Sequence, residues 1–85
     1  MPLVLLRAPL SELAGGREFD LDGVTVQETL IALESSRPAI TGWVLDERRT
    51  IRQHVNIYVN GQLAQEETSV VAADRIHVLP AITGG

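Results

Sequence analysis

The sequence predicts an α+β domain in which one β-sheet is covered by one main helix. Short apolar runs bounded by turn residues, a capped segment of helical period and a strong hairpin signal all point to this class. With 85 residues and a mass of 9.2 kDa, the chain has room for one core only. We therefore expect a single domain over residues 1–80, followed by a short flexible tail over residues 81–85.

The N-terminal part of the chain predicts two strands joined by a tight turn. Residues 3–6 are apolar at every position, which is typical of a central strand buried on both faces. Residues 11–14 can form one helical turn, and Gly15-Gly16 supplies a turn. Residues 17–22 alternate between apolar and polar side chains, so they predict a hairpin strand at the edge of the sheet.

A capping box at Thr25 and Glu28 predicts the start of the main helix, because both side chains can bind unpaired amides at a helix N-terminus. Pro38 requires the helix to end near Ser36. The helical period predicts that one stripe of the helix faces inward, formed by Val26, Leu30 and Leu33. The opposite face is predicted to face water and carries Gln27, Glu28 and Glu34.

The segment after the helix is predicted to be irregular, with an apolar connection over residues 38–45 and a charged loop over residues 46–52. Arg48-Arg49 in that loop is interpreted as solvated rather than as a binding site. Glu66-Glu67 is interpreted in the same way, within a polar loop that ends at Ser69.

The C-terminal half predicts a hairpin and a final strand. Residues 54–60 alternate strictly and end at Asn60-Gly61, a strong hairpin signal, so residues 62–64 are expected to return as a short strand. Residues 75–79 alternate again, and Pro80 should end the sheet pairing because proline has no amide hydrogen.

Composition and charge exclude several classes of function. The formal net charge of -4 disfavours binding to nucleic acid and to anionic membrane surfaces. All seven basic residues are arginine, so no lysine is present to form a Schiff base, and no cysteine is present to form a disulfide or an iron–sulfur site. His54 and His77 are interpreted as surface strand residues, and we expect no bound metal or cofactor.

The apolar run over residues 3–6 is too short to span a membrane or to form the core of a signal peptide. We therefore expect a cytoplasmic protein without a membrane partner.

The most informative feature is the terminal pair Gly84-Gly85. Residues without a Cβ atom have a slim profile and an open backbone, so this end can enter a narrow channel in another protein. Pro80 is expected to release the tail from the last strand, so the terminal carboxylate can reach away from the domain.

Three segments together resemble the small ubiquitin-like sulfur carriers, a family that includes the molybdopterin synthase small subunit and the sulfur carriers of thiamine and cysteine biosynthesis. These segments are residues 54–61 (HVNIYVNG), residues 74–81 (DRIHVLPA) and the terminal Gly84-Gly85. The resemblance covers most of the chain, since Gly15-Gly16 and the capped helix also lie where that family has them.

The resemblance implies a β-grasp fold, with a mixed sheet of four to five strands whose first and last strands lie parallel at the centre. It also implies that the chain is a carrier rather than an enzyme. A ubiquitin-activating-like enzyme would use ATP to adenylate the Gly85 carboxylate, and a sulfur donor would then convert it to a thiocarboxylate. This group would deliver sulfide in a biosynthetic pathway, such as that of cysteine or molybdopterin.

Two partners follow from the resemblance: an adenylyltransferase or sulfurtransferase that activates Gly85, and a synthase that accepts the sulfur. The tail residues expected to thread into these partners are Ala81, Ile82, Thr83 and Gly84. We expect docking through the exposed face of the sheet, with Tyr58 and Pro80 as contact residues.

Two alternatives remain open. The chain can be a ubiquitin-like modifier that is joined through Gly85 to lysines of other proteins, although it has no lysine of its own for chain formation. It can also be a β-grasp interaction module that acts without covalent chemistry and whose terminal glycines are incidental.

Overall fold

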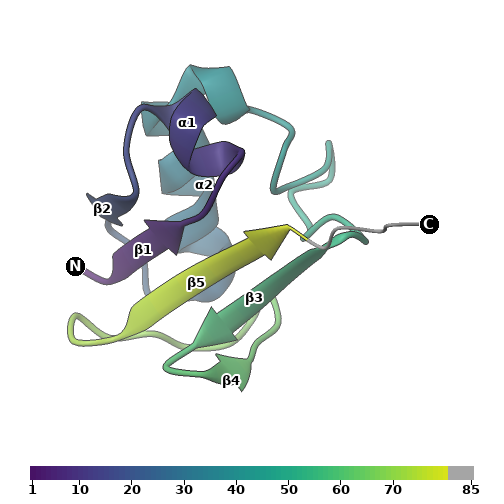
Figure 1. Cartoon of the computed structure of the whole chain (residues 1–85). Coiled ribbons are helices and arrows are strands. Elements are labelled where there is room, and N and C mark those ends of the chain that lie inside the picture. The colour runs from purple at the N-terminus through teal and green to yellow at the C-terminus, as the bar shows by residue number, and fades with distance from the viewer. Residues whose placement is uncertain (81–85) are drawn as a thin grey trace.

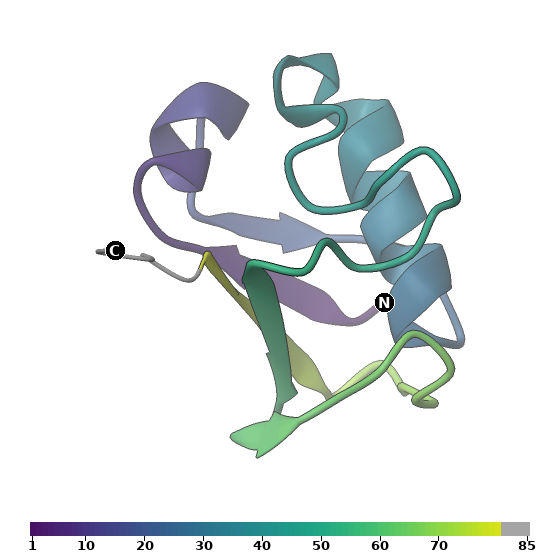
Figure 2. The same cartoon turned by 90° about the vertical axis from the view of Figure 1, so that its right-hand side faces the viewer.

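The computed structural model describes residues 1–80 as a sheet of five strands with helices on one side of it (Figure 1). The elements in chain order are β1 (Leu3–Leu6), α1 (Leu10–Ala14), β2 (Glu18–Asp20), α2 (Val26–Ser36), the 3₁₀ helix η1 (Pro38–Ile40), β3 (Val55–Val59), β4 (Gln62–Leu63) and β5 (Arg75–Pro80). The predicted α+β class and the main helix are confirmed. Figure 2, turned by 90°, shows α1 and α2 together on the same side of the sheet.

The strand order is β2-β1-β5-β3-β4, so β5 is the central strand. β1 pairs with β5 in parallel, whereas the β1–β2, β3–β5 and β3–β4 pairs are antiparallel. The mixed sheet expected from the family resemblance is therefore confirmed, including the parallel pairing of the first and last strands. β2 and β4 form the two edges, and the edge position of β2 was predicted from the alternation over residues 17–22.

The predicted hairpin at Asn60-Gly61 is confirmed. Both residues have positive φ angles, 50° for Asn60 and 87° for Gly61, which a two-residue turn between right-twisted strands requires. The Asn60 side chain also donates to a carboxylate oxygen of Asp74 at 2.8 Å and accepts from the amide of Arg75 at 2.9 Å. This turn therefore fixes the start of β5 as well as the end of β3.

The N-terminus of α2 is capped as predicted by the hydroxyl of Thr25, which accepts from the amide of Glu28 at 3.2 Å. The carboxylate of Glu28 completes the cap by accepting from the amide of Val24 at 3.3 Å. Thr29 is fully buried, and its hydroxyl donates to the carbonyl of Thr25 at 2.9 Å, so this buried polar atom has a partner. At the other end of α2, the guanidinium of Arg37 lies 4.7 Å from the ring centroid of Phe19 in β2.

One core fills the space between the sheet and the helices. Its members come from every layer of the fold, which is why the chain behaves as one packing unit over the described residues. The buried apolar residues are Val4, Leu6, Leu10, Ala14, Leu21, Val26, Leu30, Leu33, Ile40, Val44, Leu45, Val55, Ile57, Ala64, Val70, Ile76 and Val78. The predicted inward positions of α2 are all in this set, and so are Val55 and Ile57 of β3 and Ile76 and Val78 of β5, whereas Val59 of β3 is partly buried and packs against it.

Two predictions about exposure were wrong. β1 is not buried on both faces: Val4 and Leu6 are buried, but Leu3 and Leu5 are only half-buried, because both helices pack on the other face. Glu34 does not simply face water. Its carboxylate accepts from backbone amides of the following loop, whose folding back toward α2 could not be read from helical period alone.

Candidate functional site at the end of the central strand

The predicted tail residues Ala81, Ile82, Thr83, Gly84 and Gly85 lie outside the described residues. What the structure does describe is the strand that carries them. β5 is bonded on both sides as far as its last residues, with Leu6 of β1 opposite Val78 and Val55 of β3 opposite Pro80. We call this end of the sheet, formed by Leu6, Val55 and Pro80, the exit end.

The exit end is held in place by the core. Ile76 and Val78 of β5 are fully buried, and the neighbouring Leu6 and Val55 are buried as well. A site carried by a central strand is positioned more firmly than one carried by a loop. The fold therefore offers a rigid base from which the segment after Pro80 begins.

A row of two leucines, a histidine and a tyrosine crosses the face of the sheet that the helices leave open. Leu5 lies opposite His77, His77 lies opposite Tyr58, and Tyr58 lies opposite Leu63, so the row spans β1, β5, β3 and β4. Leu63 is 63% exposed, and the other three residues are half-buried. We call these four residues the outer row. Leucine and tyrosine side chains that reach the surface on one face can form part of a contact surface for another protein.

The two predicted docking residues lie at different places on this sheet. Tyr58 is in the outer row, opposite His77, whereas Pro80 pairs with Val55 at the exit end. Three residues of strand separate the two positions, which corresponds to about 10 Å. The structure therefore does not bring Tyr58 and Pro80 into one cluster, although one partner surface can span both.

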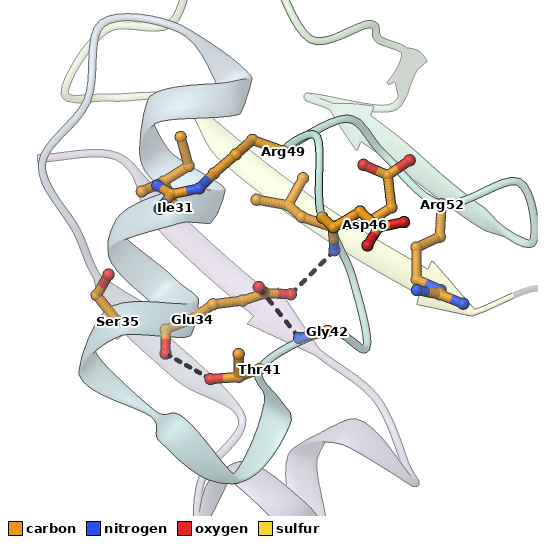
Figure 3. A pocket seen from close by; sticks show the side chains of 10 residues that line it. Ile31, Glu34, Ser35, Thr41, Gly42, Asp46, Arg49 and Arg52 are labelled. Carbon is orange, nitrogen blue, oxygen red and sulfur yellow. Dashed lines mark hydrogen bonds between the residues drawn. The ribbon is translucent and has the colours of Figure 1, made fainter.

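A separate pocket of about 570 Å³ lies between α2 and the loop that follows η1 (Figure 3). Its acidic groups hold the loop in place. Glu34 accepts from the amides of Val44 and Leu45 at 3.0 and 2.9 Å, and Asp46 accepts from the hydroxyl of Thr50 at 2.7 Å. Arg49 and Arg52 also line the pocket, so its charges are of both signs. Sequence reasoning missed this pocket, because only the folding of the loop back onto α2 creates it.

Two aspartates have lowered pKa values for the same structural reason. Hydrogen bonds from the hydroxyl and then the amide of Thr50 lower the pKa of Asp46. Hydrogen bonds from the amide of Val71 and then the side chain of Asn60 lower the pKa of Asp74. Each of these carboxylates closes its own turn, so both are structural groups.

His54 and His77 do not form a site together. His54 is exposed just before β3, whereas His77 is half-buried in the middle of β5. Within residues 1–80, no group of three or more His, Cys, Asp or Glu residues is placed to hold a metal ion. None of the helices in that same range has both the length and the apolar character needed to cross a membrane.

Comparison with known proteins places these features in context. The model of the ThiS family matches residues 4–85, which is nearly the whole chain. The chain is also 34% identical over 83 residues to small archaeal modifier protein 1 of Haloferax volcanii, a match that covers 94% of this chain and 95% of that protein.

Solved structures agree with this similarity. The crystal structure of the Haloferax volcanii protein superposes with a TM-score of 0.84 at 32% identity and covers 99% of this chain and 98% of that chain. The solution structure of small archaeal modifier protein 1 from Methanosarcina acetivorans has a TM-score of 0.87 at 31% identity, covering 99% and 95%. A chain in the crystal structure of the Amycolatopsis orientalis BexX/CysO complex has a TM-score of 0.86 at 27% identity, and both chains are covered completely.

Proposed function

This chain belongs to the ThiS family, and on that premise we propose that it is a sulfur carrier whose Gly85 carboxylate is converted to a thiocarboxylate. The observation that carries the proposal is the central position of β5, the strand that precedes the C-terminal residues. The strand that leads into it is the central strand of a fixed sheet, and the family match extends through residue 85. A rigid base and a slim Gly-Gly end suit presentation to another protein's active site.

The proposed chemistry takes place in two steps on partner enzymes. In the first, an oxygen of the Gly85 carboxylate attacks the α-phosphorus of ATP, and pyrophosphate leaves. In the second, sulfide attacks the acyl carbon and displaces AMP, which gives the thiocarboxylate directly. If the donor is a persulfide, the same attack gives an acyl disulfide, and a thiol of the partner enzyme then cleaves its S–S bond, which releases the thiocarboxylate and leaves a disulfide on the partner. The first partner is a ubiquitin-activating-like adenylyltransferase, and this chain acts as its co-substrate.

The acceptor of the sulfur is proposed to be a synthase-type enzyme, which would hold an electrophile for the thiocarboxylate to attack. Similarity to a chain of the BexX/CysO complex supports a carrier that associates with a second protein. The pathways that fit this design are those of cysteine, molybdopterin and related sulfur-containing products. We place both reactions in the cytoplasm, where ATP is available.

Mass spectrometry of the intact protein tests the proposal. The chain purified from its own cells is first weighed, to establish that the mature protein ends at Gly85. It is then incubated with ATP, a sulfur donor and the activating enzyme encoded in the same genome. Replacement of one oxygen by sulfur adds about 16 Da, and an unchanged mass in the presence of demonstrably active enzyme overturns the proposal.

Deletion of Gly84 and Gly85 provides the matched control. The shortened chain should keep its thermal unfolding midpoint, since the described core ends before these residues, but it should gain no mass. Full pathway activity of this variant in cells would instead indicate an interaction module that acts without covalent chemistry.

A second candidate function is protein modification. It is favoured by the 34% identity to a protein named as a small archaeal modifier. In this case Gly85 would form an amide bond with a lysine of another protein. An immunoblot of the tagged chain in its own cells should then show a ladder of adducts that disappears when Gly84 and Gly85 are deleted. A single band of the free chain would exclude this role under the conditions used.

A further inference from the structure

The charge of the molecule is distributed unevenly along the direction of its strands. The chain as a whole has a formal net charge of -4, yet the backbone places three arginines near the exit end. Arg7 directly follows the last residue of β1, the carbonyl of Arg17 accepts from the amide of Leu6 at 2.8 Å, and the carbonyl of Arg52 accepts from the amide of Val55 at 3.0 Å. We call Arg7, Arg17 and Arg52 the arginine collar.

The opposite end of the sheet is acidic. Asp20 lies opposite Leu3 at the start of β1, and the carbonyl of Asp74 accepts from the amide of Leu3 at 3.1 Å. Asp22 follows two residues after β2, and Arg75 is the basic residue at this end of β5. The sheet therefore has an arginine-rich exit end and an aspartate-rich far end.

The side chains of the arginine collar are exposed to solvent. No side-chain hydrogen bond within residues 1–80 is made by their guanidinium groups. The carboxylates nearest to Arg7 and Arg17 in the sequence are Glu12 and Glu18, and Arg52 lines the same pocket as Asp46 and Glu47. Exposed guanidinium groups that the fold does not use are suited to bidentate contacts with carboxylates of another protein.

We propose that the arginine collar docks onto an acidic rim around the channel of the enzyme that activates Gly85. This inference rests on the proposed function. Arg7 and Arg52 flank β5 on both sides, through its neighbours β1 and β3, and Arg17 extends the basic surface toward β2. Contact at three points around the exit end would orient the domain with its tail toward the channel.

The length of the tail indicates that the collar meets the rim rather than the nucleotide. Five residues, 81–85, span at most about 16–18 Å when fully extended. When the Gly85 carboxylate reaches ATP, the collar therefore lies outside the channel, at up to this distance from the nucleotide. When the tail is extended, this distance exceeds the Debye length of about 8 Å at physiological ionic strength, so a direct effect of the collar on the phosphates would be screened. The acidic far end would be repelled by the same rim, which disfavours the reversed orientation.

Charge reversal at single positions tests the proposal. Arg7→Glu and Arg52→Glu are compared with Arg75→Glu, which makes the same change in net charge at the far end of β5. Pyrophosphate release by the activating enzyme from the same genome is measured as a function of carrier concentration. The two collar variants should raise KM by about threefold to tenfold with kcat unchanged, and Arg75→Glu should change KM by less than about twofold.

Salt dependence and folding complete the test. The KM differences should shrink when the salt is raised to about 1 M, where the Debye length falls to about 3 Å. Arg7→Gln and Arg52→Gln, which remove charge without reversing it, should give smaller increases in KM, and all variants should unfold at the wild-type temperature. Equal KM values for the collar variants and Arg75→Glu would overturn this inference while leaving the proposed function intact. Absence of pyrophosphate release with the wild-type chain would overturn both.

Discussion

At the scale of single residues, Glu34 has a larger structural role than its helical position indicates. It lies in the last turns of α2 and accepts from the amides of Gly42, Val44 and Leu45, at 3.3, 3.0 and 2.9 Å. Backbone amides that point at one carboxylate gain charge-assisted hydrogen bonds, which are stronger than neutral ones. Glu34 thereby fixes the loop that forms one wall of the pocket in Figure 3.

Replacing Glu34 by Gln should destabilise the fold. The amide keeps one acceptor oxygen but presents an NH₂ group to donors, so at least one loop amide loses its partner. We expect a loss of about 1–2 kcal/mol in the free energy of unfolding, measured by urea denaturation. Glu67→Gln, at an exposed position, is the control and should leave the midpoint unchanged. Equal stability of both variants would contradict the role assigned to Glu34.

The lowered pKa values of Asp46 and Asp74 predict the acid side of the stability profile. A carboxyl whose pKa is lower in the folded state stabilises the fold above its unfolded pKa, about 3.9, and this contribution is lost as the pH falls through the folded pKa. The urea midpoint should therefore fall below about pH 4. In Asp74→Asn, which cannot titrate at this position, the fall should be shallower than in wild type. If the urea midpoint of Asp74→Asn fell with pH as steeply as that of wild type, the hydrogen bonds from Val71 and Asn60 would not be the cause of the loss of stability in acid.

At the scale of elements, the connection between β2 and α2 depends on close approach. A Cβ atom placed on Gly23 would lie 2.6 Å from the amide nitrogen and 2.9 Å from the Cα atom of Thr29. Thr29 is fully buried in α2, so its backbone cannot move away without disturbing the core. Gly23 is therefore required by packing, although its φ angle is not in the left-handed region.

Gly23→Ala should destabilise the fold by more than about 2 kcal/mol, because overpacking against helix backbone forces α2 or the turn to shift. Gly42→Ala is the comparison. That position has a φ angle of +85° but open space around it, so only backbone strain of about 1 kcal/mol is expected. Thermal unfolding followed by circular dichroism ranks the two variants, and the reverse order would refute the packing argument.

The elements that could be predicted from the sequence are those whose signals are local. The hydroxyl of Thr25 acts within its own helix turn, and Asn60-Gly61 acts within its own hairpin, so both were predictable. The bonds from Glu34 to the loop join residues that are 8–11 positions apart. Leu5 is half-buried because the helices pack on the other face of the sheet. Neither is encoded in a local pattern, and both were predicted incorrectly.

At the scale of the whole molecule, the candidate site was predictable in part. The terminal Gly84-Gly85 and the docking role of Tyr58 come from the sequence and its family resemblance, and they stay predictions. The arginine collar could not be read from the sequence, because Arg7, Arg17 and Arg52 are placed at one end of the sheet only by the pairing of β1 with β2 and β5 and of β3 with β5. Strand order is a property of the complete sheet.

Docking through the outer row can be tested separately from the collar. Tyr58→Ser removes the aromatic side chain at the middle of the row, and it should raise KM for activation of Gly85 by about tenfold, as expected for loss of an aromatic contact residue. Val71→Ser is the matched control, because Val71 is 64% exposed but lies in the turn before β5. An equal KM for both variants would show that the outer row is not part of the docking surface.

The central place of β5 also has a mechanical consequence. A protein motor that grips the C-terminal segment pulls along β5, which is hydrogen-bonded to β1 on one side and to β3 on the other. Traction along a strand loads both ladders in shear, so many bonds must rupture together instead of opening one after another. The segment whose carboxylate is proposed to be activated is thus attached where pulling meets the resistance of both hydrogen-bond ladders at once.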